Sequence, residues 1–211
     1  MILSRKLQAF GAVIAAFFMV STAAGPLALA QAAEGPAPTI NSLNATLLST
    51  MKQAQSLGVQ GRYDALSPVL SKTYDTPLMA RLAVGQSWAS LQPDQQAAVI
   101  NGFRRMMIAT YAKRFDGFSG ESFQIVDISN RGTADKMVKT QIIQSNGKPV
   151  AINYLMRKTG PDWKIVDVYL DGTISELASR RAEFSTILKS GGPDALIASL
   201  KKQGDKLLSG S

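Results

Sequence analysis

Cysteine and histidine are both absent from this sequence of 211 residues. Without cysteine, the chain cannot form disulfides, offer a thiol nucleophile or carry a lipid anchor on a cysteine. Without either residue, it also lacks imidazole bases, Ser-His-Asp triads and the usual ligands of zinc. Core packing must therefore hold the fold, and most familiar forms of nucleophilic and metal catalysis are excluded.

Long hydrophobic runs are also scarce. The apolar run at residues 9–20 is about a dozen residues long, whereas a helix that spans a membrane needs ~20. Arg5 and Lys6 precede this run, and Ala28-Leu29-Ala30 follows it. Charge, apolar core and small residues in this order are typical of a signal peptide. We therefore predict a cleavable signal peptide over residues 1–30, cleaved directly after Ala30.

An uncleaved membrane anchor is the competing interpretation of the same segment. It requires the apolar run to continue through Leu29, but polar residues and then Gly25 and Pro26 interrupt it. Cleavage leaves residues 31–211, a length that suits one compact domain.

The mature chain is basic. Its formal charge is +6, because the signal peptide removes two of the 23 basic residues and none of the 15 acidic ones. A positive balance favours anionic surfaces such as phospholipid headgroups or acidic partner proteins. The basic residues are scattered and not interleaved with aromatic residues, so nucleic-acid binding is not expected.

Helical periodicity dominates residues 40–117, where apolar residues recur every three to four positions. The pattern predicts a first helix over 40–54 and a second, shorter helix over 62–70. Pro77 suits the first turn of a third helix, which Gly85 ends. A long helix follows from Pro93 to about residue 115.

The period changes to two over residues 122–170, which indicates strands. Asn146-Gly147 between two alternating segments is a strong hairpin signal. Because antiparallel sheets pack one face and solvate the other, helices should cover a single concave face. We predict an α+β fold with a four-stranded antiparallel sheet and two C-terminal helices over 174–208, separated at Gly191-Gly192. The strands are expected at 123–128, 136–144, 150–157 and 163–170.

Apolar residues on the inward faces are candidates for lining a cavity between sheet and helices. Methionines among them are flexible and polarizable, which suits an adaptable binding surface. The same spacing is also the ordinary pattern of a closed core, and periodicity alone does not reveal a cavity, so both interpretations stay open. The candidate lining residues are Met79, Leu82, Trp88, Phe103, Met107, Tyr111, Val138, Ile142, Ile152, Tyr154, Met156 and Val168.

Five short motifs occur in order between residues 41 and 202, and together they resemble the MlaC family, also called the toluene-tolerance or ABC-transporter auxiliary family. Each motif is weak alone, but five in order are specific. They are D-x-x-x-M-x-R-x-A-x-G at 75–85, P-x-Q-Q…F…T-Y at 93–111, Ser119-Gly120, N-G-K-P at 146–149, and the W-K strand at 163–171.

The resemblance implies a periplasmic lipid carrier without a cofactor. The implied fold is a cystatin-like cone with an added helical subdomain, whose groove takes phospholipid acyl chains. The implied partners are an inner-membrane ABC transporter with its membrane-anchored lipid-binding subunit, and an outer-membrane lipoprotein complex.

One segment departs from the common wording of the family. Residues 174–184 lack the usual V-x-N-Y-R-x-x-F run and are closer to the hopanoid-associated HpnM branch. For that branch the outer partner would be a hopanoid export system. Phospholipid and hopanoid are therefore both open as the cargo.

Arg181 falls on the same helical stripe as Leu177 and Phe184. A cation on an apolar stripe is costly unless it is paired or reaches water. It is therefore a candidate to bind a lipid phosphate or polar head at the pocket mouth by bidentate hydrogen bonds. The alternative is an internal ion pair with an acidic neighbour such as Asp167 or Glu183.

An enzymatic alternative is an isomerase or hydrolase of a polycyclic lipid. Cone folds of this type include enzymes that use a buried Asp and a Tyr, and Asp127, Asp167, Tyr154 and Tyr169 lie on predicted strands. A carboxyl group with a raised pKa in an apolar cone could act as a general base. The missing histidine and the wide spacing of the acids favour the carrier.

Overall fold

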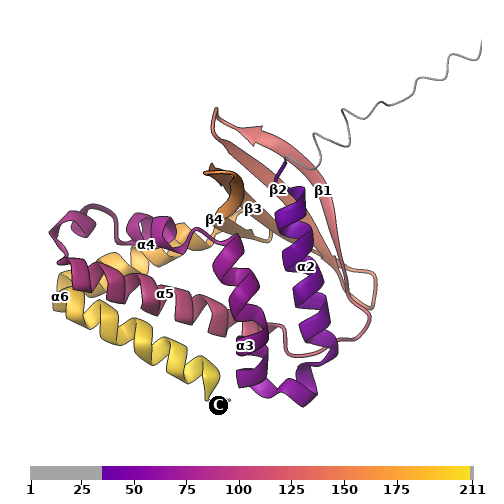
Figure 1. Ribbon diagram of the computed structural model, residues 1–211, viewed down its shortest axis with the longest axis horizontal. Helices are drawn as coiled ribbons and strands as arrows, with labels where there is room; N and C mark the ends of the chain where they lie inside the picture. Colours follow the sequence, from indigo (N-terminus) through magenta and orange to yellow (C-terminus); the bar gives the residue numbers. More distant parts are fainter. Residues whose placement is uncertain (1–34, 210–211) are drawn as a thin grey trace, which may run out of the picture.

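The computed structural model describes residues 35–209. The predicted signal peptide and its cleavage site lie outside these residues. Figure 1 shows helices gathered against one face of a twisted sheet. The helices that precede the sheet are α2 (Ala37–Lys52), α3 (Ala54–Thr73), α4 (Thr76–Val84), the 3-10 helix η1 (Gly85–Ser90) and α5 (Pro93–Arg114).

The sheet and a final helix form the second half of the chain. All neighbouring strands are antiparallel, in the order β1-β2-β3-β4-β5. The α+β prediction is confirmed. The elements are β1 (Ser122–Arg131), β2 (Asp135–Ile143), β3 (Pro149–Thr159), β4 (Asp162–Leu170), β5 (Ile174–Ser175) and α6 (Glu176–Leu208).

The predicted strand number was one too low. Asp171 and Gly172 both have positive φ, at 48° and 76°, and they turn the chain back on itself. Ile174 and Ser175 then pair with the end of β4 as the short strand β5. Ile174 was predicted to be helical, but α6 begins two residues later, at Glu176.

Local chemistry fixes where helix α4 begins and how it meets the sheet. The side chain of Asp75 accepts a hydrogen bond from the backbone N–H of Leu78 at 3.1 Å, as expected of an N-cap. Pro77 lies in the first turn. The backbone N–H of Asp75 also donates to the carbonyl of Ile165 at 2.9 Å, which ties the start of α4 to β4.

Two helices contain breaks at glycine. Helix α3 is longer than the helix predicted over 62–70. Its backbone departs from helical geometry only at Gly58, with φ of 61°, and is helical again directly after it. In α6 the break is at Gly192, with φ of 70° and ψ of −170°. This break divides α6 into segments 176–191 and 193–208.

The C-terminal segment of α6 runs parallel to α5. Gln95 donates a hydrogen bond to Asp194, the backbone of Gly102 lies against Leu200, and Arg105 pairs with Asp205 at 2.9 Å. Since the residue numbers rise together on both helices, their C-terminal ends lie side by side (Figure 1).

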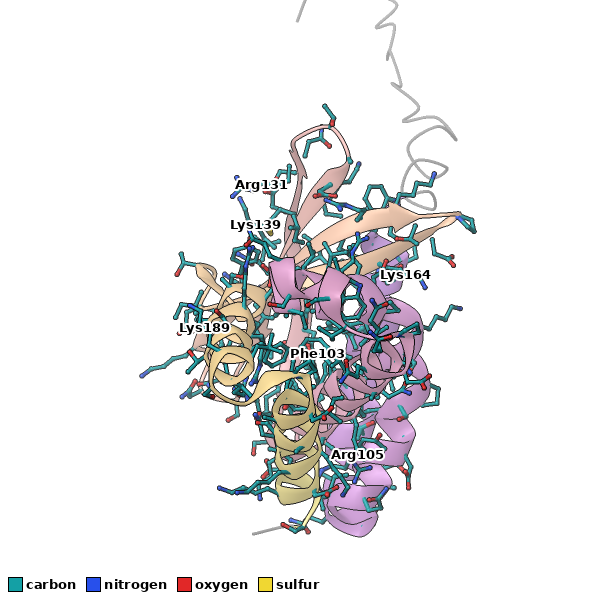
Figure 2. The ribbon with its side chains drawn as sticks, turned by 90° about the vertical axis from the view of Figure 1, so that its left-hand side faces the viewer. Phe103, Arg105, Arg131, Lys139, Lys164 and Lys189 are labelled. Atoms are coloured by element: carbon teal, nitrogen blue, oxygen red, sulfur yellow. The ribbon has the colours of Figure 1, made fainter. Side chains whose placement is uncertain are left out.

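The core lies between the sheet and the helices. Val138, Tyr154 and Val168 are in register across β2, β3 and β4 and are almost fully buried. Figure 2 shows Phe103 of α5 in the interior, whereas Lys164 and other lysines point outward. Among residues 35–209, no helix combines the length and apolarity that crossing a membrane requires.

Candidate functional site

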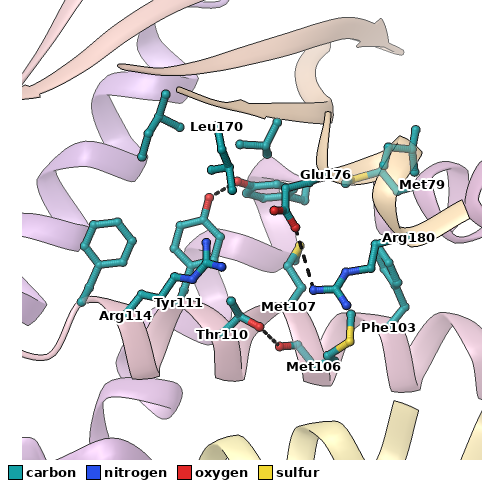
Figure 3. A pocket seen from close by; sticks show the side chains of 15 residues that line it. Met79, Phe103, Met106, Met107, Thr110, Tyr111, Arg114, Leu170, Glu176 and Arg180 are labelled. Atoms are coloured by element: carbon teal, nitrogen blue, oxygen red, sulfur yellow. Dashed lines mark hydrogen bonds and ion pairs between the residues drawn. The ribbon is translucent and has the colours of Figure 1, made fainter. Parts of the chain in front are cut away.

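An apolar cavity of about 130 Å³ lies between the inner face of the sheet and helix α5 (Figure 3). Its wall carries few polar groups, which are concentrated at one cluster of tyrosines and at the mouth. The lining residues are Tyr74, Met79, Phe103, Met106, Met107, Thr110, Tyr111, Arg114, Phe115, Ile152, Val168, Leu170, Glu176, Leu177 and Arg180.

Helix α5 supplies one wall of the cavity. Phe103, Met107, Tyr111 and Arg114 recur at three- to four-residue spacing along it, so they share one face of the helix. Phe103 also packs edge-on against Phe184 of α6, with ring centroids 5.9 Å apart. This wall therefore changes along the helix from apolar to cationic.

Strands β3 and β4 supply the opposite wall. Ile152 lies opposite Leu170, and Tyr154 lies opposite Val168, in the antiparallel register. Residues two apart on a strand point to the same face, so Ile152, Val168 and Leu170 all face the helices. The alternation seen in the sequence positions this wall.

A cluster of phenol groups adjoins the cavity. The hydroxyls of Tyr74 and Tyr111 are hydrogen-bonded to each other, and the phenol of Tyr154 lies near enough to that of Tyr111 to interact with it electrostatically. Burial raises the pKa of Tyr74, Tyr111 and Tyr154 above the ordinary value of a phenol. The three groups are therefore neutral at physiological pH and act as hydrogen-bond donors and acceptors.

Arg180 and Glu176 lie at the mouth. The guanidinium of Arg180 is 3.8 Å from the carboxylate of Glu176 and 2.9 Å from that of Glu183. Its side chain is 22% exposed. Figure 3 shows Arg180 with Glu176 on one side of the cavity and Arg114 beside Tyr111 on the other. Two cations thus flank an apolar space.

Comparison with known proteins places the chain in a family. The family model described as MlaC protein matches residues 41–202, which is most of the chain. The chain belongs to the MlaC family. A solved structure of a phospholipid-binding protein from Ralstonia solanacearum, determined in complex with a phospholipid, has a similar fold, with a TM-score of 0.72. The two chains are 21% identical, and the match covers 82% of this chain and 98% of that one.

In the structure of this MlaC-family chain, half of the twelve predicted apolar residues line the same cavity. The other apolar candidates lie elsewhere. Leu82 is 38% exposed, because the buried stripe of α4 runs through Met79, Ala80 and Ala83. Those that line the cavity are Met79, Phe103, Met107, Tyr111, Ile152 and Val168.

The remaining candidates pack outside the cavity. Val138, Tyr154 and Met156 are almost fully buried in the core beside it. Trp88 packs against the core from η1, and Ile142 is partly buried on β2. Periodicity identifies the inner face of an element, but it does not identify the positions along that face where a space remains.

Arg181 does not reach the cavity, and its neighbour Arg180 does. Arg181 is exposed and lies over Gly85, with Nε 3.4 Å from the position that a Cβ would take there. It forms no ion pair with Asp167 or Glu183, since Glu183 pairs with Arg180. Counting Ile174 as helical shifted the predicted stripe by one residue.

Several lining residues were not among those predicted from periodicity. Met106, Thr110 and Arg114 continue the α5 face, and Arg114 lies seven residues after Met107. The same spacing rule would have found them, since Met106, Thr110 and Arg114 follow Phe103 at intervals of three, four and four residues. Tyr74 lies between two helices, where no periodic pattern applies. Predicting Glu176 and Leu177 would have required knowing where α6 begins.

The residues of the enzymatic alternative are engaged in other contacts. Asp127 pairs with Lys139 at 3.0 Å, and the hydrogen bond from Lys139 lowers the pKa of that carboxyl, opposite to the shift a general base requires. Asp167 accepts hydrogen bonds from the Ser175 hydroxyl at 2.6 Å and the Leu177 N–H at 3.0 Å. Neither aspartate lines the cavity, and Asp167 instead joins β4 to the start of α6.

Proposed function

We propose that this protein is a periplasmic carrier that holds the hydrocarbon of a phospholipid in the cavity and transfers it between membrane complexes. One observation carries the proposal. An apolar cavity lies between α5 and the sheet, in a fold shared with a phospholipid-binding protein that was solved with its phospholipid.

The energetics explain why such a carrier is needed. Exposing each CH₂ group to water costs ~0.8 kcal/mol, so the ~30 CH₂ groups of a diacyl lipid cost on the order of 20 kcal/mol. Free diffusion between two membranes is therefore negligible. A cavity lined by Met, Phe, Ile, Val and Leu side chains removes most of this cost, and no bond has to be broken.

The cavity must widen when a lipid enters. Its volume of about 130 Å³ is below the roughly 300–1,000 Å³ typical of ligand sites. The wall is built from separate elements, including α5, the sheet and the N-terminal segment of α6. Met79, Met106 and Met107 on that wall are unbranched and can adopt new rotamers at low cost.

We infer that the partner complexes determine the direction of lipid transport. An inner-membrane ABC transporter with a membrane-anchored lipid-binding subunit would exchange lipid at one membrane, and an outer-membrane lipoprotein complex at the other. If the cargo were a hopanoid, a hopanoid exporter would replace the outer-membrane lipoprotein complex. The phospholipid in the related structure favours phospholipid as the cargo.

Cavity-filling variants test the proposal. Ile152→Trp and Leu170→Trp place a large side chain in the cavity, whereas Val126→Trp adds the same ring at a strand position that is 56% exposed. The proteins are expressed with their native signal, purified from the periplasm and extracted with organic solvent, and the lipid is counted by mass spectrometry. We expect stoichiometric phospholipid on the wild type and on Val126→Trp, and little on the two filled variants.

Circular dichroism establishes that each variant is folded before lipid is counted. If folded wild-type protein carries no lipid and takes up none from phospholipid vesicles, the carrier function is wrong. Equal lipid on all four proteins would place the binding site away from this cavity.

A further inference from the structure

We propose that a basic recess beside the cavity mouth binds the phosphate group of the lipid, so that the protein selects amphiphiles with a phosphate diester over uncharged ones. The inference rests on the proposed function, because it assigns the headgroup of the same ligand. The recess is lined by Met106, Thr110, Lys113, Arg114, Arg180, Gln203, Lys206 and Leu207.

The recess and the cavity are adjacent. They share Met106, Thr110, Arg114 and Arg180 in their walls. The recess has a volume of about 380 Å³, which is larger than the apolar cavity. A ligand with its hydrocarbon in the cavity would therefore bring a group attached to the chain end directly into the recess.

The parallel packing of two helices concentrates positive charge there. Lys113 and Arg114 lie in the last turn of α5, and Lys206 lies in the last turn of α6. A cation in the last turn stabilises a helix end, which accounts for each residue separately. Because α5 and the end of α6 run side by side, these cations and Arg180 surround one hollow.

The nearby acidic groups offset this charge only in part, since the two carboxylates beside the recess share the guanidinium of Arg180. Glu176 and Glu183 are held by Arg180. Asp205 precedes Lys206 but pairs with Arg105 at 2.9 Å and Lys201 at 2.6 Å.

Three of the cations around the recess are not paired with a carboxylate. Within residues 35–209, Lys113, Arg114 and Lys206 take part in no ion pair. Like charges in a concave surface raise the local positive potential and attract an anion.

A phosphate diester matches this site. It carries one negative charge and oxygen acceptors that a guanidinium binds by two parallel hydrogen bonds. Arg114 is exposed and beside the cavity mouth, so its guanidinium is available for this contact. An uncharged polycyclic lipid would leave the cations without a partner, which favours a phospholipid as the ligand.

The test compares two ligands with identical acyl chains. Delipidated protein is titrated with phosphatidylglycerol and with the corresponding diacylglycerol in detergent, and binding is followed by tryptophan fluorescence and native mass spectrometry. The recess variant is Arg114→Gln combined with Lys206→Gln. The control is Lys72→Gln combined with Lys148→Gln, which removes the same charge, including one cation from a last helical turn.

We expect the recess variant to bind phosphatidylglycerol about tenfold more weakly than the control, the effect of losing charge-assisted hydrogen bonds. Diacylglycerol should bind both variants equally. Inorganic phosphate should compete with phosphatidylglycerol only at millimolar concentration and should not affect diacylglycerol.

Three results would overturn the assignment. Equal phosphatidylglycerol affinity of the recess and control variants would show that the recess does not hold the headgroup. Tight binding of inorganic phosphate without lipid would make the recess a site for the free anion. Weaker adhesion to anionic vesicles with unchanged lipid affinity would make it a membrane-docking surface. Failure of the wild type to bind either lipid would instead contradict the proposed function itself.

Discussion

At the scale of single residues, the hydroxyl groups of Tyr74 and Tyr111 lie on a largely apolar part of the cavity wall, and Tyr154 is buried in the core beside them. Tyr111 is the hydrogen-bond partner of Tyr74, and it also interacts electrostatically with Tyr154. A buried hydroxyl without a partner costs free energy because its bond to water is lost and not replaced. The buried Tyr74 hydroxyl therefore depends on Tyr111 for its hydrogen bond.

Tyr111→Phe should destabilise the fold more than removing the hydroxyl group of a tyrosine elsewhere. It leaves the buried hydroxyl of Tyr74 without its hydrogen-bond partner, at an expected cost of about 1–3 kcal/mol in the free energy of unfolding. Tyr63→Phe is the control, because the Tyr63 ring lies against Arg105 in a partly exposed position. Urea denaturation measures both, and equal midpoints would show that the cluster contributes no net stability.

The site residues show what spacing can predict. Phe103, Met107 and Tyr111 were found because one helix presents them on one face. Arg180 was missed in favour of Arg181 because both lie within one turn of Leu177 and Phe184, and Ile174, which precedes the start of α6, was counted as helical. Asp167 and Ser175 set that start through a contact between strands, which helical periodicity does not contain.

At the scale of elements, helix α6 consists of two segments with different tasks. Residues 176–191 contribute to the cavity mouth, and residues 193–208 pack along α5. Gly192 joins them with φ of 70° and ψ of −170°, a conformation that essentially only glycine adopts. The angle between the segments therefore depends on the absence of a side chain at this position.

Gly192→Ala should lower stability by about 1–3 kcal/mol, because alanine is strained in this backbone conformation even where space is available. A Cβ at Gly192 would meet no atom within 4 Å, so any loss reports the backbone and not a clash. Gly117→Ala is the matched control, since a Cβ there also meets nothing within 4 Å and its φ is not positive. Thermal unfolding of both variants gives the comparison. Equal midpoints would mean that the break relaxes at no cost.

At the scale of the whole molecule, the layer architecture was predictable and the space inside it was not. Alternation over residues 150–156 and the turn at Asn146-Gly147 act locally, so strand positions and pairing could be deduced. A cavity depends instead on how far the sheet lies from α5. That distance is set by many side chains together, so it cannot be predicted from any one of them.

The buried tyrosines make the whole fold sensitive to alkaline pH. Their pKa is raised by burial in the folded state, so above the ordinary phenol value of ~10 the unfolded chain holds fewer protons than the folded one. This contribution to stability is complete below pH ~10 and is lost progressively as the pH rises further. We expect tyrosinate absorbance from Tyr74, Tyr111 and Tyr154 to appear together with the loss of far-ultraviolet circular dichroism. Ionisation of all five tyrosines with the circular dichroism unchanged would show instead that water reaches the cluster in the folded protein.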